Sequence, residues 1–361
     1  MDELMRPSPA AVTTVPVSAD PVASVEELTA EWLSTALGRR IDRVVAAQVG
    51  SGQIGSCHRL TLHGEAGTER MIAKLGAADA TARAMLAGAY RTESRFYAEL
   101  AEGLSIRIPD CRLATEVDDD GHVVILLEEA VRAEQGDQVA GCTPGQARAA
   151  AVNLAGLHAP RWCDPALLEL GWINPAGEDD TALLTELAGP TVSAFLDQVG
   201  HLLSAEARST LTELPSLFGP WLKARTERFA LVHGDYRLDN LMFSTVDEEV
   251  VAVDWQTLSI GLPARDLAYL LGTGLAPADR RTHERGIVEA WHAALVRLGV
   301  DGYTLAEAWD DYRFAMVQGP LVTVFGCAYG TRTERGDQMF AAMAERSCAA
   351  IRELGTLELV G

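Results

Sequence analysis

The chain has 361 residues, 48% of them hydrophobic and 22% charged, which suits about two domains or one two-lobed domain with a sizeable core. Its 51 acidic and 30 basic residues give a formal net charge of -21, which makes a nucleic-acid backbone a poor partner. No apolar run reaches the roughly 20 residues that span a bilayer, and the N-terminus lacks a signal-peptide pattern. We therefore expect a cytoplasmic protein with neither a nucleic-acid nor a membrane partner.

The first third of the chain predicts a small lobe of strands with one long helix. Residues 1–22 are rich in Pro, Ser, Ala and Val without a period, which is typical of a disordered tail. Ser24 begins a capping-box motif that predicts a helix to Leu37. The lobe, 23–128, is then expected to contain strands near 43–49, 57–63, 70–75, 111–117 and 122–127 and a helix at 80–102.

The rest of the chain predicts a larger helical lobe. A hinge or linker is expected at 129–142, after which Thr143 and Pro144 supply an N-cap and a first-turn proline. The lobe, 143–361, therefore starts with a helix to about His158. Only 240–244 and 250–253 are strand-like in this half, and they predict one hairpin. Further helices are predicted near 179–199, 204–226, 277–298, 304–326 and 334–354.

A glycine triplet in the first lobe has a spacing that occurs in two different classes of phosphate-binding loop. Gly50, Gly52 and Gly55 have the spacing G-x-G-x-x-G, which occurs both in dinucleotide-binding folds and in kinase loops. The first of these needs a helix straight after the glycines and an acidic residue about 20 positions on. The residues after Gly55 instead alternate with strand period, and Lys74 stands where the acidic residue is required. The glycines alone leave a plain hairpin turn open.

Lys74 is unusual for this sequence. Only Lys74 and Lys223 are lysine among 30 basic residues, and Lys74 lies inside the apolar segment "MIAKL". Lysine carries a compact charge on a flexible stem, which suits it to phosphate oxygens. A lysine on an edge strand that faces solvent is the alternative.

Three residues around the predicted hairpin have the chemistry of phosphoryl transfer. Asp235 and Asn240 lie in "HGDYRLDNLMF" (233–243), and Asp254 lies in "VAVDWQ" (251–256). Transfer from ATP needs a carboxylate beside the acceptor hydroxyl and hard oxygen ligands for Mg²⁺. One hairpin places a base and two metal ligands together, although each residue could also be an ordinary turn residue.

This pair of motifs resembles the phosphotransferase family that includes aminoglycoside phosphotransferases, choline kinases and ecdysteroid-kinase-like enzymes. The resemblance covers roughly residues 25 to 350. It implies an α+β, bilobal protein-kinase-like fold, with a small antiparallel-sheet N-lobe that carries one main helix and a larger, mostly helical C-lobe.

The resemblance also implies site residues. Asp235 is expected to be the catalytic base, Asn240 and Asp254 to bind Mg²⁺, and Lys74 to hold the α- and β-phosphates beside a helix carboxylate. Glu93 shares a helix face with the apolar Phe96, Tyr97 and Leu100, whereas Glu99 and Glu102 point away, so Glu93 is the expected partner. The glycine triplet would cover the phosphates, and the backbone near Leu127, Glu128 and Glu129 would meet adenine.

Neighbouring residues keep more than one interpretation. Arg237 could neutralise charge on the transferred phosphoryl group or form a salt bridge to Asp239 or to a neighbouring residue. His233 is expected to brace the loop, His158 to be a structural histidine, and Asp266 to serve the helix dipole or to steady the loop.

The sequence departs from protein kinases in ways that favour a small acceptor. It has His-Gly-Asp at 233–235 and Asp-Trp-Gln at 254–256, where protein kinases carry His-Arg-Asp and Asp-Phe-Gly. We therefore expect an ATP- and Mg²⁺-dependent kinase that phosphorylates a hydroxyl of a small molecule, such as an aminoglycoside, an amino alcohol or a sugar-like compound. The alternatives are a catalytically silent, pseudokinase-like nucleotide-binding protein and a dinucleotide-dependent oxidoreductase.

The acceptor, the choice between ATP and GTP, and the oligomeric state, monomer or homodimer, stay open. Acidic segments at 178–180 and 334–337 could line a pocket for an amine or could be solvated helix ends.

Overall fold

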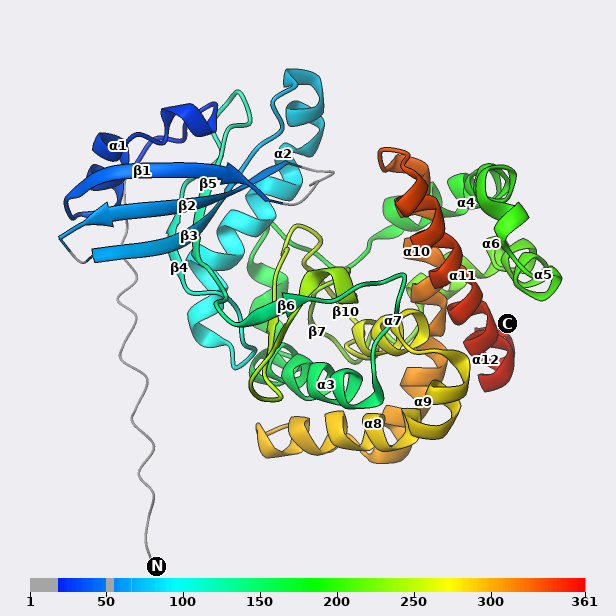
Figure 1. Ribbon diagram of the computed structural model, residues 1–361. Helices are drawn as coiled ribbons and strands as arrows, with labels where there is room; N and C mark the ends of the chain where they lie inside the picture. The colour runs from blue at the N-terminus through cyan, green and yellow to red at the C-terminus, as the bar shows by residue number, and fades with distance from the viewer. Residues whose placement is uncertain (1–18, 50–54, 66, 361) are drawn as a thin grey trace, which may run out of the picture. The chain divides into compact units, whose positions relative to one another are not determined.

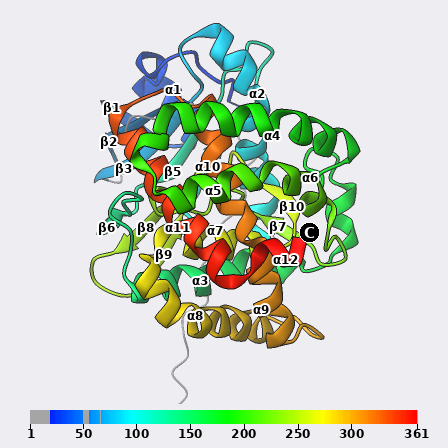
Figure 2. The ribbon, with the colours of Figure 1, turned by 90° about the vertical axis from the view of Figure 1, so that its right-hand side faces the viewer.

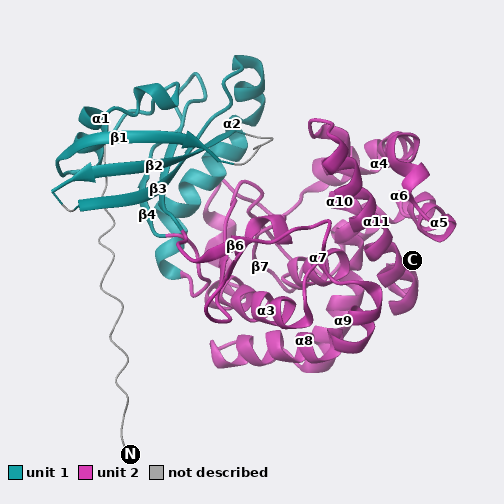
Figure 3. Cartoon of the chain, viewed as in Figure 1, with its two compact units in different colours: residues 1–103, 110–129 teal, residues 104–109, 130–361 magenta. Residues whose placement is uncertain are grey.

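The computed structural model describes residues 19–49, 55–65 and 67–360, which form two compact units (Figure 3). Unit 1 comprises Met1–Gly103 and Asp110–Glu129, and unit 2 comprises Leu104–Pro109 and Ala130–Gly361. Most of the expected disordered tail, together with Gly50 and Gly52, lies outside the described residues. In the described part of the chain, no helix is long and apolar enough to cross a membrane.

Unit 1 is built on a five-stranded antiparallel sheet with the order β1-β2-β3-β5-β4 (Figure 1). One face of the sheet packs against α1 (Ala30–Leu37) through a shared cluster that includes Leu33, Leu60, Leu62 and Ala73. The strands are β1 (Ile41–Gln48), β2 (Ser56–Gly64), β3 (Gly67–Leu75), β4 (Cys111–Ala114) and β5 (Val124–Glu128).

The strand alternation determines which way Lys74 points. Met71, Ala73 and Leu75 of β3 are buried in the cluster beside α1. Because side chains alternate along a strand, Lys74 points to the opposite face, where it meets α2 (Ala80–Arg95). The predicted helix at 80–102 is α2 followed by a π turn, Phe96–Leu100, and a short 3-10 turn, Ala101–Gly103.

The start of the first helix differs from the prediction. Ser24 makes no side-chain cap, and only a 3-10 turn, Val25–Glu27, follows it. Leu28 is buried in the sheet cluster, and Thr29 then caps α1 by accepting the Trp32 N–H at 3.2 Å. Burial of Leu28 thus moves the helix start to the next capping residue, and the capping box predicted at Ser24 was wrong.

Unit 2 is mostly helical, with α7 (Ala264–Gly274) at its centre. Nearly every residue of α7 is buried, and α7 contacts α3 (Pro144–His158), α10 (Gln318–Tyr329) and α11 (Glu334–Leu354). Figure 2 shows α11 running past α5 and α7. The other helices are α4 (Glu178–Val199), α5 (Ala205–Glu213), α6 (Pro215–Lys223), α8 (Pro277–Arg297), α9 (Leu305–Phe314) and α12 (Thr356–Val360).

Two long helices predicted in unit 2 are each divided. The predicted helix at 204–226 is α5 and α6, which meet at Pro215. The predicted helix at 304–326 is α9, a 3-10 turn at Ala315–Val317, and α10, whose third residue is Pro320. Proline lacks the N–H that an uninterrupted helix would use, so both divisions follow from the proline positions.

Unit 2 holds more strands than the single hairpin that the sequence predicts. The expected hairpin is β8 (Leu241–Ser244) with β9 (Val250–Ala252), and β6 (Ala133–Gln135) adds to its edge. A second pair is β7 (Ala230–Val232) with β10 (Ser259–Gly261). The prediction of one strand-like region was wrong because β6, β7 and β10 are three residues long, too short to show a period.

Replacing Gly156 by alanine tests the packing of α3. A Cβ on Gly156 would lie 2.5 Å from the backbone of Ser105 and Ile106, so we expect Gly156→Ala to lower the free energy of unfolding by about 1 to 3 kcal/mol. Gly145→Ala is the control, because a Cβ there meets only Thr143 Oγ1 at 3.9 Å. Urea denaturation of both variants measures the difference. Equal stability of the two would contradict the packing argument.

Candidate active site

The 233–240 segment, here called the catalytic loop, joins β7 to β8 in unit 2. The turn at 253–258 lies beside it, because β9 pairs with β8 and β10 pairs with β7. Val232 faces Ser259 and Leu241 faces Ala252, so both ends of the loop are fixed against both ends of the turn.

Asp266, in the first turn of α7, anchors the start of the catalytic loop. It is 1% exposed and accepts the backbone N–H groups of His233 at 2.7 Å and Gly234 at 2.9 Å. His158, at the end of α3, lies 3.3 Å from the same carboxylate through Nε2, and Trp291 donates its indole N–H to His158 Nδ1 at 3.3 Å. Of the two interpretations offered for Asp266, the contacts favour steadying the loop, and His158 is part of the same anchor.

The turn that follows the anchor needs glycine. Gly234 has φ 81°, and a Cβ there would lie 2.6 Å from the Thr257 carbonyl oxygen. His233 is buried and donates from Nε2 to the Val253 carbonyl at 3.1 Å, while its Nδ1 accepts the Asp235 N–H at 3.3 Å. These contacts tie the loop to the neighbouring turn, which is the bracing role expected for His233.

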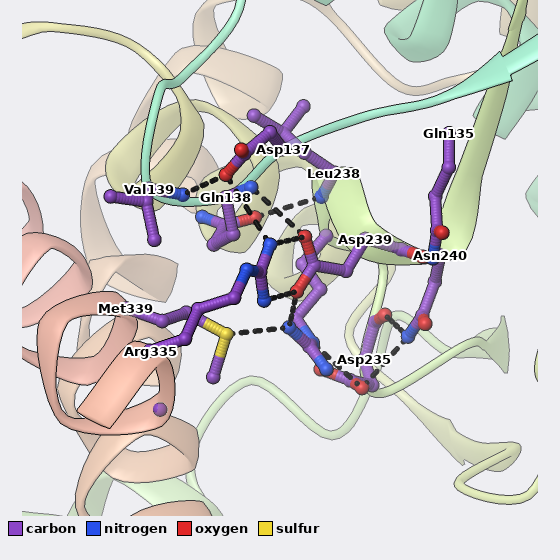
Figure 4. Close-up of polar contacts among 12 residues, drawn as sticks. Gln135, Asp137, Gln138, Val139, Asp235, Leu238, Asp239, Asn240, Arg335 and Met339 are labelled. Carbon is purple, nitrogen blue, oxygen red and sulfur yellow. Dashed lines mark hydrogen bonds and ion pairs between the residues drawn. The ribbon is translucent and has the colours of Figure 1, made fainter. Parts of the chain in front are cut away.

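Three side chains hold the Asp235 carboxylate, and Figure 4 shows the contact with one of them, Asn240. Oδ1 accepts the Tyr269 hydroxyl at 2.9 Å, and Oδ2 accepts Asn240 Nδ2 at 2.8 Å and Arg237 Nε at 3.1 Å. The Asp235 side chain stays 21% exposed. The carboxylate is therefore oriented on both oxygens and still reachable by a ligand.

Arg237 forms a salt bridge with Asp239, which was one of the two interpretations of this residue. Its Nη1 donates to Asp239 at 2.8 Å, and its Nε donates to Asp235. Burial opposes the charged form, but the nearby Asp235 carboxylate raises the pKa of the guanidinium above its usual value. Arg237 also lies 3.1 Å from Met339 Sδ, which connects the loop to α11.

Asn240 and Asp254 offer hard oxygen atoms, and Asn240 contacts this carboxylate directly. Asn240 is buried and donates Nδ2 to Asp235, which turns its amide oxygen away from Asp235. The backbone carbonyl of Asn240 accepts the N–H of Val253 at 3.0 Å, and Asp254 is the next residue along the chain. Asp254 has φ 69°, a left-handed conformation that costs a non-glycine residue on the order of 1 to 3 kcal/mol and is concentrated at functional sites.

A metal at Asn240 and Asp254 would be bound by few protein groups. Among the residues with described positions, no group of three or more His, Cys, Asp or Glu side chains could hold a metal ion. Mg²⁺ is usually held by one or two carboxylates together with substrate phosphates and water. One carboxylate and one amide oxygen fit that pattern.

In unit 1, Lys74 Nζ lies 2.5 Å from Glu93 Oε1, with the side chains 16% and 2% exposed. β3 lies between β2 and β5, so the alternative of Lys74 on an edge strand was wrong. Glu99 is 45% exposed and pairs with Arg95.

The glycine segment joins the antiparallel strands β1 and β2, and no helix follows it. This arrangement contradicts the dinucleotide-binding interpretation, which requires a strand followed by a helix. Gly55 is the described member of the triplet, and a Cβ there would lie 2.5 Å from the Leu75 carbonyl oxygen.

The backbone expected to meet adenine is already hydrogen-bonded in part. Leu127 is paired within the sheet with Ile72 of β3. The N–H groups of Glu128 and Glu129 donate to the carbonyls of Asp110 and Arg70 at 2.9 and 3.4 Å. These two backbone donors are therefore engaged within unit 1.

Sequence reasoning missed Gln138 and Tyr269. Gln138 is fully buried, accepts the Leu238 N–H on Oε1 at 2.8 Å, and donates from Nε2 to the Thr273 carbonyl at 3.0 Å. It lies in the expected linker, where a single glutamine carries no signal. Tyr269 follows Asp266 by three residues, hence on the same face of α7, and that spacing could have identified it.

The acidic segments behave as helix starts. Residues 178–180 form the exposed first turn of α4, and Glu178 pairs with Lys223 at 2.6 Å. In α11, Asp337 accepts Gln198 Nε2 at 2.6 Å, while Arg335 reaches Asp239 and Asp137 (Figure 4).

The comparisons with known proteins identify a family through a family model and a fold through solved structures. The model of a phosphotransferase enzyme family matches residues 47–313. A putative aminoglycoside phosphotransferase structure from Ralstonia eutropha aligns with TM-score 0.56 and 17% identity, over 91% of this chain and 98% of that one. A Plasmodium vivax ethanolamine kinase aligns with TM-score 0.54 and 11% identity, over 88% and 86%. A GDP complex of aminoglycoside 2'-phosphotransferase-IIIa aligns with TM-score 0.51 and 16% identity, over 85% and 93%.

These structures share the bilobal, kinase-like α+β fold, so the expected fold class is confirmed. Curated relatives align over short stretches. The mouse acyl-CoA dehydrogenase family member 10 is 52% identical over 46 residues, which is 12% of this chain and 4% of that protein. The chain therefore matches only a small part of the length of this relative.

Replacing Asp266 tests whether the anchor holds the catalytic loop. Asp266→Ala leaves the N–H groups of His233 and Gly234 buried without their acceptor, which costs about 1 to 3 kcal/mol for each group. We expect a loss of several kcal/mol in the free energy of unfolding, measured with urea. Asp279→Ala, at an exposed position in the first turn of α8, should cost less than about 1 kcal/mol. Similar losses in the two variants would show that Asp266 is not an anchor.

Proposed function

Because the chain belongs to the phosphotransferase enzyme family, we propose that it is a kinase that transfers the γ-phosphate of ATP to a hydroxyl of a small molecule in the presence of Mg²⁺. The observation that carries this proposal is the Asp235 carboxylate, accessible and held on both oxygens, with Asn240 hydrogen-bonded to it. Positioned carboxylates and hard oxygen ligands are what positioning-dominated phosphoryl transfer requires.

Asp235 is the proposed catalytic base. Its carboxylate accepts the proton of the acceptor hydroxyl while the acceptor oxygen forms a bond to the γ-phosphorus. The bond from that phosphorus to the oxygen of the β-phosphate breaks, and ADP leaves. No phosphorylated enzyme is formed, and the proton on Asp235 passes to solvent after turnover.

The other site residues bind or neutralise charge. The amide oxygen of Asn240 and the carboxylate of Asp254 would hold Mg²⁺, which neutralises charge on the phosphates when it is bound. Lys74, kept in place by Glu93, would hold the α- and β-phosphates. Arg237, which is paired with Asp235 and Asp239, would also lie close enough to the base to share its charge with the transferred phosphoryl group.

One experiment can identify both the acceptor and the nucleotide. The similar structures include an ethanolamine kinase and aminoglycoside phosphotransferases, which supports amino alcohols and aminosugars as first acceptors to test. One of them is a GDP complex, so ATP and GTP should be compared. A coupled assay of nucleoside-diphosphate release over aminoglycosides, amino alcohols, sugars, nucleosides and macrolides tests both. The proposal fails if no acceptor stimulates release with either nucleotide.

We expect Asp235→Asn to abolish most turnover. Loss of a general base typically costs about 10²- to 10⁴-fold in rate, and the amide keeps the shape of the side chain. The affinity for Mg·ATP, measured by calorimetry, should stay within about twofold, because Asp235 acts on the acceptor. Asp247→Asn, in the exposed β8–β9 turn, is the control and should keep full activity. Turnover of Asp235→Asn close to wild type at saturating ATP would rule out Asp235 as the base.

We expect Asp254→Asn to weaken Mg²⁺-dependent nucleotide binding. Asparagine tolerates the left-handed conformation of residue 254, so the variant removes charge without adding backbone strain. Mg·ATP affinity should fall about tenfold or more, whereas binding of ATP in the presence of EDTA should not change. Asp254→Ala should show a fall at least as large, with some added strain. Unchanged calorimetric affinity with Mg²⁺ in both variants would contradict the metal role.

A further inference from the structure

Tyr269 is a side chain from outside the catalytic loop that donates a hydrogen bond to Asp235. It lies on α7, is 1% exposed, and donates its hydroxyl to Asp235 Oδ1 at 2.9 Å. Its ring belongs to a buried cluster with Met339 and Met343 of α11. Packing therefore fixes the ring, and through it the position of the hydroxyl.

The three donors to Asp235 are not equivalent. Asn240 and Arg237 belong to the catalytic loop itself, and both donate to Oδ2. Tyr269 belongs to the helix whose first turn carries Asp266, the anchor of the loop. Tyr269 therefore ties Oδ1 to α7, outside the loop segment that carries Asp235.

The remaining lone pair identifies the oxygen that can react. A carboxylate offers about four lone-pair sites, two on each oxygen. Asn240 and Arg237 occupy both sites on Oδ2, and Tyr269 occupies one on Oδ1. The site left among the described contacts is on Oδ1, next to the Tyr269 hydroxyl. Burial and the neighbouring Asp235 raise the pKa of Tyr269 well above its usual value, so its hydroxyl stays a donor at neutral pH.

We propose that Tyr269 is a positioning residue for the phosphoryl transfer, which fixes the rotation of the Asp235 carboxylate so that Oδ1 accepts the proton of the acceptor hydroxyl. The inference rests on the proposed function. It adds which oxygen of Asp235 accepts the proton and which residue orients that oxygen.

Tyr269→Phe tests the inference, because it removes the hydroxyl and keeps the ring in its cluster. We expect kcat to fall about 10- to 100-fold, the loss that a misplaced reacting group produces, with KM and calorimetric Kd for Mg·ATP unchanged. The assay uses ATP with the first acceptor that stimulates ADP release in the screen described above.

Tyr312→Phe is the matched control. Tyr312 is fully buried and donates its hydroxyl to Glu284 Oε2 at 2.8 Å, so the variant loses the same kind of bond away from Asp235. It should be destabilised to a similar extent and keep wild-type kcat. An equal loss of kcat in Tyr312→Phe and Tyr269→Phe would overturn the inference, because the effect would then be general.

A double-mutant cycle separates positioning from a structural effect. In the Asp235→Asn background, Tyr269→Phe should cause no further loss of residual turnover, because its target is already removed. A further 10-fold loss would overturn the inference.

Crystal structures of wild type and Tyr269→Phe give a readout that needs no acceptor. The Asp235 carboxylate should rotate or occupy two orientations in the variant, and an unchanged carboxylate would overturn the inference. If no acceptor is phosphorylated by the wild type, the proposed function fails, and the crystallographic comparison still decides whether Tyr269 orients Asp235.

Discussion

The candidate active site depends on one buried carboxylate that accepts backbone hydrogen bonds. Asp266 is removed from water, which is costly for a charge unless donors replace the lost hydration. The donors are the N–H groups of His233 and Gly234, with His158 beside them. Because satisfying Asp266 requires these N–H groups to point at α7, the left-handed turn at Gly234 and the direction of the chain into Asp235 follow from it.

Around this anchor, charges alternate in sign along the catalytic loop. Arg237 lies between Asp235 and Asp239, and Arg335 reaches Asp239 and Asp137 from α11 (Figure 4). The inner pairs are short and largely buried, whereas the contacts of Arg335 are 3.4 Å long and its side chain is 57% exposed. Exposed ion pairs contribute little to stability, so the inner pairs and Gln138, and not Arg335, add to the order that Asp266 gives the loop.

The sequence was informative where function needs particular residue types close together in the chain. Asp235, Asn240 and Asp254 lie in the segments that flank one short hairpin, and helical spacing selected Glu93 as the residue that meets Lys74. The division into a strand-rich and a helical lobe followed from the change between strand and helix periods, whereas the kinase-like fold class followed from the family resemblance. Local signals failed where distant contacts decide: burial of Leu28 moved the start of α1, and strands of three residues show no period. Gln138 gave no signal, because its role depends on residues more than 90 positions away.

The long sequence separations of these contacts have a consequence for folding kinetics. The bond from Gln138 to Leu238 holds the loop directly, and the bonds from His158 to Asp266 and from Arg346 to Thr273 hold α7, which anchors the loop; these bonds close separations of 100, 108 and 73 residues. Contacts at such separations form only after the entropy of closing the intervening loops has been paid, which makes them slow. Unit 2 must bring α3, α7 and α11 together before Asp235 can take its place. The arrangement around Asp235 is therefore expected to form only after these long-range contacts have been made.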